Sequence, residues 1–183
     1  MITPPPIYTF SEISQILSGL RKNHPELCTL PIDMERFADV RLGLYIDEMP
    51  GLAENSVIAS AIIDNFTRIV IDSKIFNTDQ DASRFFIAHE LGHYFLHREH
   101  FQKHGAEMSK DEWLEFATSD SSRAAELNAN TFARLLLVPA NNLLEQAKLI
   151  PPPSIPSLTR IFGVKTWVLE HRINDSDVLT GLQ

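Results

Sequence analysis

Hydrophobic residues recur along most of the chain at spacings of three and four, which is the pattern of amphipathic helices. The pattern changes between residues 44 and 71, where Ile and Val are frequent and two turn signals, Pro50-Gly51 and Asp64-Asn65, separate short apolar runs. We therefore predict strands in the middle of a mostly helical chain. The predicted strands are 44–47, 57–63 and 68–71. The predicted helices are 10–23, 31–40, 84–98, 121–138, 141–149, 158–162 and 165–173. We also predict a polar surface loop over 99–109 and a short helix that starts near Ser109.

Residues with capping chemistry mark several of these boundaries. Thr9 and Glu12 have the spacing of a capping box, which predicts the start of the first helix. Pro31 is suited to open the second helix, because proline is tolerated at the first helical position. Thr78 and Asp81 are candidate N-caps for the third predicted helix.

The short links between the predicted strands imply an antiparallel three-stranded meander, with the helix through 84–98 packed across it. We therefore expect an α+β fold, in which this small antiparallel sheet packs on the central helix and a second long helix, 121–138. The proline triplet at 151–153 separates this domain, predicted as residues 1–150, from a C-terminal helical segment, residues 151–183.

The C-terminal segment contains a predicted helix, a tight turn at Gly163-Val164 and a second helix, which is the shape of a helix-turn-helix. The second helix, 165–173, offers only Lys165 and Arg172 as cations. A packing role is therefore favoured, and we expect no direct binding of nucleic acid.

Composition and charge narrow the functional classes. The 183 residues carry a formal net charge of −8, which opposes a surface that holds nucleic-acid phosphates. Cys28 is the only cysteine, so we expect neither an internal disulfide nor a Cys-rich zinc ribbon, which favours a reducing cytoplasm. No apolar run approaches membrane-spanning length, and the first residues lack the features of a signal peptide. We expect a cytoplasmic protein without membrane contact, whereas its oligomeric state stays open.

One predicted helix contains His89-Glu90-Leu91-Gly92-His93, an H-E-x-x-H pattern. Histidines four apart lie on one helical face, so both imidazoles can reach one ion. Glu90 lies beside that face, where it can act as a base on an activated water without being a ligand. The pattern arises by chance in roughly two per cent of chains with such a composition. Its place in a periodic helix, with Gly92 between the histidines, favours a metal site over ordinary surface histidines.

A catalytic zinc site needs a third protein ligand. The metzincin pattern would require His at position 99 and Gly at position 96, where this chain has Glu99 and Leu96. The best candidate is Glu126 on the 121–138 helix. The alternatives are that Glu126 is a surface acid, or that another acid is the ligand; the other acids considered are Glu112, Glu115 and Asp120.

Small residues near Glu126 support this choice. Ala129 and Ala133 would let the second helix approach Gly92 closely. Asn130, four residues after Glu126, shares its face and can hydrogen-bond the outer nitrogen of a liganding histidine, which would fix its tautomer.

The segments 86–97 and 126–133, followed by Leu136-Leu137-Val138-Pro139, resemble the ImmA/IrrE family of zincin-like metallopeptidases. The likeness is strongest over residues 60–140, and 162–172 is similar to the family's C-terminal helical tail. The resemblance implies a gluzincin-type endopeptidase with Zn²⁺ on His89, His93 and Glu126, and Glu90 as the base. It also implies cleavage of a helix-turn-helix repressor or antitoxin-like partner in a regulatory or stress response. Some relatives carry an N-terminal helix-turn-helix that this chain lacks, so DNA contact is expected only through a partner.

Two features of such a site are left open by the residues. The donor that stabilises the oxyanion is Tyr94, His97, His100, His104 or His171. For His97, a structural role or a partly solvated place behind the metal ligands is favoured. The strand 68–71, by analogy with zincins, is the expected edge of the cleft to which an extended peptide adds.

A second class of function must be weighed against an enzyme. The chain is alternatively a partner-binding regulatory or toxin–antitoxin component, whose metal is structural or only weakly hydrolytic. The presence of three ligand types and a base favours the enzyme. A small, acidic cytoplasmic protease would act safely only on one exposed linker of one partner, so we expect selective cleavage.

Overall fold

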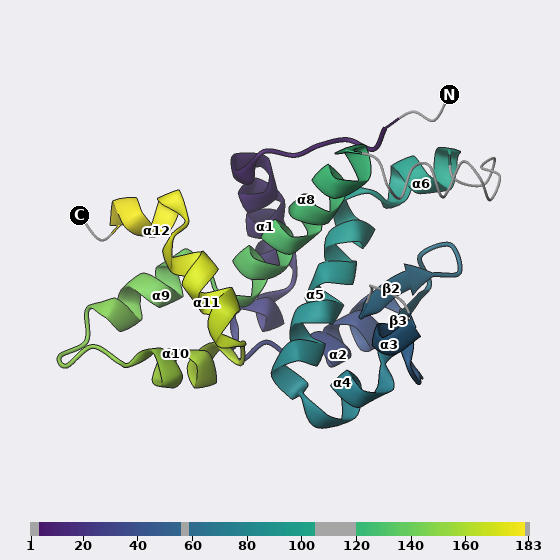
Figure 1. Ribbon diagram of the computed structural model, residues 1–183. Helices are drawn as coiled ribbons and strands as arrows, with labels where there is room; N and C mark the ends of the chain where they lie inside the picture. The colour runs from purple at the N-terminus through teal and green to yellow at the C-terminus, as the bar shows by residue number, and fades with distance from the viewer. Residues whose placement is uncertain (1–3, 56–58, 105–119, 182–183) are drawn as a thin grey trace.

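The computed structural model describes residues 4–55, 59–104 and 120–181, and shows a mostly helical α+β protein with a small mixed sheet (Figure 1). Helix α5 (Gln80–Leu96) runs through the middle of the molecule. The sheet packs on one side of α5, and helix α8 (Asp120–Leu137) crosses its other side. Helix α1 (Phe10–Asn23) in turn packs against α8, so α5 lies at the centre of the fold.

The first predicted helix is confirmed as α1, with both of its predicted bounds. The backbone N–H of Glu12 donates to Thr9 Oγ1 at 3.3 Å, and the backbone N–H of Thr9 donates to the Glu12 carboxylate at 2.7 Å. The predicted capping box is therefore present.

The prediction that Pro31 opens the second helix is wrong. Pro31 lies in a bend, and the helical residues begin only at α2 (Met34–Arg36), which continues into the π-helical turn η2 (Phe37–Arg41). Asp33 decides this start, because its carboxylate accepts a hydrogen bond from the backbone N–H of Arg36 at 3.0 Å and caps the helix. A short 3-10 helix, η1 (Pro25–Cys28), precedes this region.

The sheet is mixed, so the predicted antiparallel meander is wrong. Its strands β1 (Tyr45–Met49), β2 (Ser60–Ile63) and β3 (Arg68–Asp72) lie in the order β1-β3-β2. β2 and β3 are antiparallel neighbours, whereas β1 runs parallel to β3.

The two connections between strands explain this order. The link from β2 to β3 is tight, with Asp64, Asn65 and Phe66 at positive φ, so these two strands form the hairpin that the turn signal predicted. The link from β1 to β2 contains helix α3 (Leu52–Asn55), and the chain returns on the far side of β3. A helix in the connection leaves room for a crossover that a two-residue turn would forbid.

Helix α5 begins after a different cap from those predicted. A short helix, α4 (Ser73–Thr78), precedes it, and the N-cap of α5 is Asp79 rather than Thr78 or Asp81. The Asp79 carboxylate accepts from the backbone N–H of Ala82 at 3.1 Å. Thr78 is itself the last helical residue of α4, and Asp81 lies inside α5, so neither has the extended geometry of a cap.

The polar stretch after α5 is partly helical, where a surface loop was predicted. Helix α6 spans Arg98–His104, and the backbone N–H of Phe101 donates to His97 O at 3.1 Å. The Phe101 ring stacks on Phe66 at 6.1 Å between centroids, which gives this polar helix one apolar contact. The rest of the predicted loop and the predicted helix that starts near Ser109 lie outside the described residues.

The second half of the chain is helical as predicted. Helix α8 agrees with the predicted helix 121–138 to within one residue, and α9 (Ala140–Ala147) and α11 (Thr166–Ile173) lie within two residues of their predicted bounds. Helix α10 (Ile155–Phe162) begins three residues before its predicted start at 158. Gly163, at φ +62°, forms the predicted turn between α10 and α11. A last helix, α12 (Ser176–Gly181), was not predicted. None of the helices in the described residues has both the length and the apolar character needed to cross a membrane.

The core is formed where α5 and α8 face each other and where α5 meets the sheet. Every residue named next is fully buried. They are Ile87, Ala88 and Leu91 on α5, Ala129, Phe132 and Ala133 on α8, and Ile69 and Ile71 on β3. This packing places α5 and α8 in direct contact along their middle turns.

Polar contacts tie the C-terminal helices to the rest of the fold. Arg172 is 1% exposed, and its guanidinium donates to Val138 O at 2.8 Å and to the Asp177 carboxylate at 2.6 and 2.7 Å. Arg84 of α5 donates to Gly163 O at 2.6 Å. Residues 151–181 therefore pack on α5, α8 and α9, whereas the division of the chain at residue 150 stays a prediction.

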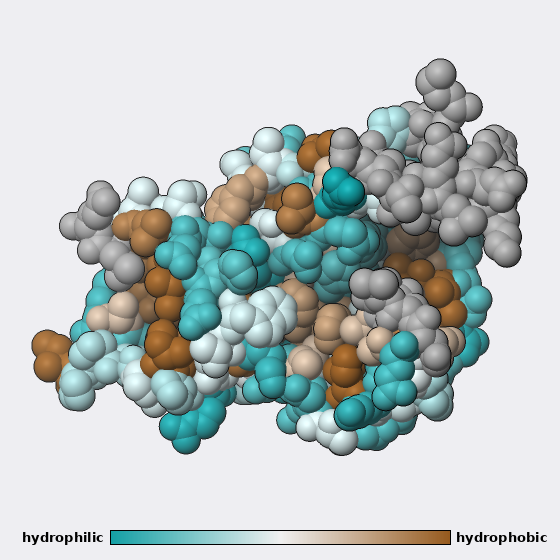
Figure 2. All heavy atoms as spheres, in the orientation of Figure 1, coloured by the Kyte–Doolittle hydropathy of each residue, from teal (hydrophilic) through white to brown (hydrophobic). Residues whose placement is uncertain are grey.

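Exposed apolar side chains lie on the C-terminal helices and in the bend between α9 and α10, at the left of the molecule in Figure 2. Leu149, Ile150 and Leu179 are among them, and Ile150 is 98% exposed. An apolar depression at this end of the molecule is lined in part by Leu144 and Ile173.

Candidate metal centre

Three predicted ligands come together between α5 and α8. The Nε2 atoms of His89 and His93 lie 3.2 Å apart. The Glu126 carboxylate lies 3.1 Å from His89 Nε2 and 3.2 Å from His93 Nε2. Two ligand atoms at about 2.1 Å from a tetrahedral zinc ion are separated by roughly 3.4 Å. The spacing of the three side chains therefore fits one such ion.

Each element supplies its ligands for a simple geometric reason. His89 and His93 stack on one face of α5 because they are one turn apart. Glu126 reaches them from α8 because the two helices are almost in contact at Gly92, as predicted. A Cβ on Gly92 would lie only 2.8 Å from Ala129 Cα and 3.1 Å from Ala129 O.

The cluster opens to solvent on the side of the carboxylate. The side chain of Glu126 is 54% exposed, whereas those of His89 and His93 are 12% and 13% exposed. A site with two nearly buried imidazoles and one accessible carboxylate leaves space for water or substrate, which a closed structural site does not.

The charges of His89 and Glu126 stabilise each other. Burial raises the pKa of Glu126, but its hydrogen bonds with His89 and His93 outweigh this and hold the pKa well below its usual range. Burial lowers the pKa of His89, but the hydrogen bond with Glu126 and the charges of Glu90 and Glu126 outweigh burial and raise it. A metal ion would therefore have to displace a proton from this cluster when it binds.

The outer nitrogens of both histidines also have partners. Asn130 Oδ1 lies 3.0 Å from His89 Nδ1, which is the contact predicted for this residue. His97 Nδ1 lies 3.2 Å from His93 Nδ1. Burial, followed by the neighbouring His93, lowers the pKa of His97 to about 3, so its ring is neutral at physiological pH.

Glu90 is held from the sheet side of α5. It is 3% exposed, and Ser60 Oγ donates to Glu90 Oε1 at 2.6 Å. Ser60 is the first residue of β2, and nothing in the sequence singled it out. The contact of Ser60 with Glu90 depends on the position of β2 against α5. The predicted antiparallel meander had a different strand order and did not reveal this position.

The position of β2 also corrects the predicted edge of the cleft. The strand 68–71 was expected there, but it is β3, the central strand of the sheet. β2 is an outer strand, and it is the outer strand that contacts α5 through Ser60 and Glu90. The edge next to the candidate base therefore belongs to β2.

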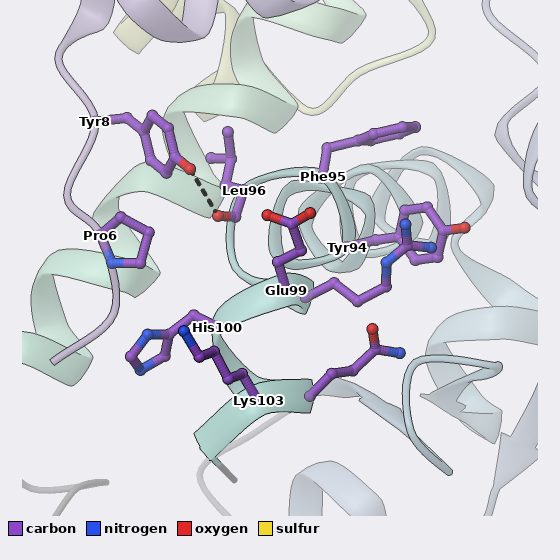
Figure 3. Close-up of a pocket in the computed structure, with 10 residues that line it drawn as sticks. Pro6, Tyr8, Tyr94, Phe95, Leu96, Glu99, His100 and Lys103 are labelled. Atoms are coloured by element: carbon purple, nitrogen blue, oxygen red, sulfur yellow. Dashed lines mark hydrogen bonds between the residues drawn. The ribbon is translucent and has the colours of Figure 1, made fainter. Parts of the chain in front are cut away.

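Two of the five oxyanion candidates, Tyr94 and His100, line a cavity of about 900 Å³ at the C-terminal end of α5 (Figure 3). Pro6 and Tyr8 of the N-terminal segment lie across this cavity from Tyr94. His97 is completely buried and His171 is exposed on α11. The side chain of His104 lies outside the described residues.

The alternative ligands fall in the part of the chain that is not described. Glu112 and Glu115 lie within residues 105–119, and the side chain of Asp120 is likewise outside the description. Among the described residues, His89, His93 and Glu126 form the cluster of His, Cys, Asp and Glu side chains that is close enough to hold an ion.

Gly92→Ala tests the contact that joins the two helices. The added methyl group would meet backbone atoms of Ala129, which no side-chain rotation can move. Alanine has a higher helix propensity than glycine, by about 1 kcal/mol, but we expect the steric clash to outweigh this gain. The free energy of unfolding should fall by about 1–3 kcal/mol, as it does for overpacked cores. Thermal or urea unfolding measures this change, and metal content should fall with it because α8 carries Glu126.

Gly19→Ala on α1 is the matched control, because no atom lies within 4 Å of a Cβ built there. This variant should gain stability, by about 0.5–1 kcal/mol. Equal stabilisation of both variants would contradict the close approach at Gly92.

Comparison with known families gives one finding. The model of the peptidase M78 family, described as the IrrE N-terminal-like domain, matches residues 41–174. This range includes α5, α8 and all three residues of the cluster. No curated protein matches the chain at a significant level.

Proposed function

The chain belongs to the peptidase M78 family of IrrE N-terminal-like domains, and from this premise we propose that it is a zinc-dependent metallopeptidase. The observation that carries the proposal is the convergence of His89, His93 and Glu126 from two helices. Two imidazoles and one carboxylate form the ligand set of catalytic zinc sites of the gluzincin type, in which one position stays open.

The residues around the cluster have separate roles in this proposal. Zinc, when bound, supplies a Lewis acid that lowers the pKa of a water molecule to about 7 and polarises a peptide carbonyl. Glu90 accepts the proton of the attacking water and returns it to the leaving amine. Ser60 holds the Glu90 carboxylate in one orientation by its hydrogen bond of 2.6 Å. Asn130 orients the His89 ring through Nδ1.

We place the substrate peptide along β2. This strand is at the edge of the sheet and runs past the buried carboxylate of Glu90. An extended peptide that adds to its outer edge, which no described strand occupies, would gain backbone hydrogen bonds whatever its sequence. Such a mode leaves selectivity to contacts away from the scissile bond.

The proposed substrate is a helix-turn-helix repressor or antitoxin-like partner in the cytoplasm, as the family resemblance suggests. The net charge of −8 supports action on a DNA-binding protein rather than on DNA itself. Remote docking would position one linker of that partner at the cluster. The isolated protein should therefore not shift DNA in a gel at physiological salt.

The test uses the purified full chain, zinc and a candidate helix-turn-helix repressor as substrate. We expect bound zinc by metal analysis, single-site cleavage of the repressor on a gel, loss of cleavage with a chelator, and negligible cleavage of casein. Bound zinc without cleavage of the repressor would favour a partner-binding protein with a structural metal. Broad degradation of casein would contradict the selective function.

A further inference from the structure

His97 is a completely buried histidine that the proposed chemistry does not use. It follows α5 as its C-cap residue, one turn after His93. Its Nδ1 atom lies 3.2 Å from Nδ1 of His93. Its other nitrogen, Nε2, is buried and has no hydrogen-bond partner in the structure. A buried polar ring with a single polar contact points to a role for that contact.

The positions of the protons follow from the direction in which His93 faces. Its Nε2 atom lies 3.2 Å from both Glu126 and His89 Nε2, so this is the nitrogen that faces the proposed ion. A liganding nitrogen needs its lone pair, so the proton of a neutral His93 must be on Nδ1. Nδ1–H can then donate only to a lone pair on His97 Nδ1, and the proton of His97 must be on Nε2.

We infer that His97 is a positioning residue, which accepts a hydrogen bond from His93 Nδ1 and so holds the His93 ring in the tautomer that presents Nε2 to the metal. The inference rests on the proposed metal site. In this arrangement, Nδ1 of each histidine ligand has one hydrogen-bond acceptor. For His89 the acceptor is Asn130 Oδ1, at 3.0 Å. One support is an amide oxygen from α8 and the other is an imidazole nitrogen at the end of α5.

Rings from the N-terminal segment and from α6 pack around His97, which is completely buried. The Tyr8 ring lies 6.1 Å from the His97 ring between centroids, and the Phe101 ring lies 6.5 Å from it. Tyr8 is fixed in turn, because its hydroxyl donates to Leu96 O at 3.0 Å (Figure 3) and its backbone N–H donates to Asn128 Oδ1 at 2.8 Å. Water is therefore kept from replacing His97 as the acceptor, and a loss of His97 leaves the His93 N–H unpaired.

A matched pair of variants separates acceptance of the hydrogen bond from packing. In His97→Asn, the amide oxygen stands where Nδ1 of the histidine stood, as Asn130 does for His89. In His97→Leu, a side chain of nearly the same shape has no acceptor. Zinc affinity of the full chain, measured by competition with a chromogenic chelator, should fall about 10–100-fold for His97→Leu. It should fall much less for His97→Asn.

Two results of this competition would overturn the inference. One is a zinc affinity of His97→Leu equal to that of the parent protein, and the other is an equal loss in both variants, which would indicate packing alone. A parent protein that binds no zinc would instead refute the proposed function, and this inference with it.

The parent protein alone provides a second test, which does not depend on the folding of a variant. With ¹⁵N-labelled histidine and bound zinc, NMR should show a proton on His93 Nδ1 and a scalar coupling from that hydrogen bond to His97 Nδ1. A proton on His97 Nδ1, or the absence of the coupling, would overturn the inference.

Discussion

Glu90→Gln is expected to abolish most of the peptidase activity and to leave zinc content and stability unchanged. The amide has the shape of the carboxylate, and its oxygen can still accept the hydrogen bond from Ser60 Oγ. It cannot accept a proton from the attacking water, and loss of a general base lowers kcat by about 10²- to 10⁴-fold. The rate of repressor cleavage, measured beside zinc content and thermal unfolding, tests this expectation.

Glu170→Gln is a suitable control for Glu90→Gln. Glu170 is an exposed acid on α11, so the substitution makes the same chemical change outside the site. Its activity should equal that of the parent protein. Full activity of Glu90→Gln with normal zinc content would remove Glu90 from the role of base.

Glu126→Ala is expected to lose zinc together with activity. It removes one of three protein ligands and leaves His89 and His93 without the carboxylate that lies 3.1 and 3.2 Å from them. Removal of a residue that only hydrogen-bonds a metal ligand lowers metal affinity by roughly 10- to 100-fold. The loss of zinc affinity in Glu126→Ala should be larger. Metal analysis after dialysis and chelator competition both measure it.

Leu127→Ala controls for changes to α8 itself. Leu127 is next to Glu126 and 65% exposed, so its truncation should change neither zinc affinity nor cleavage. If Glu126→Ala bound zinc as tightly as the parent protein, another acid would be the ligand. Glu112, Glu115 and Asp120 would then be substituted in turn.

Features that depend on a few neighbouring residues were predictable. The capping box of Thr9 and Glu12 fixes the start of α1 because its hydrogen bonds join residues three apart. The histidines of α5 share a face because helical periodicity alone puts them there. Local signals failed where several residues offered the same chemistry, as at the start of α5, where Asp79 is the cap in place of Thr78 or Asp81.

The approach of α8 to α5 was also predictable, although the two helices are far apart in the sequence. Gly92 and Ala129 have little or no side chain, and small residues on two apolar faces allow backbones to come close. That contact made Glu126 the favoured third ligand and Asn130 a candidate partner of a histidine, and the structure places both side chains beside the histidines of α5. The pairing of helices could be inferred because only a few residues decide it.

The sequence alone thus determined most of the longer helices, the H-E-x-x-H face and the candidate third ligand, because periodicity, capping and small residues act over short distances or through single contacts. The tertiary structure decided the strand order, the hydrogen bond from Ser60 to Glu90 and the contact of His97 with His93. Strand pairing depends on the path of a whole connection, and the partner of a buried polar atom depends on every element packed around it. Neither the strand pairing nor the partner of a buried polar atom can be inferred from the spacing of neighbouring residues.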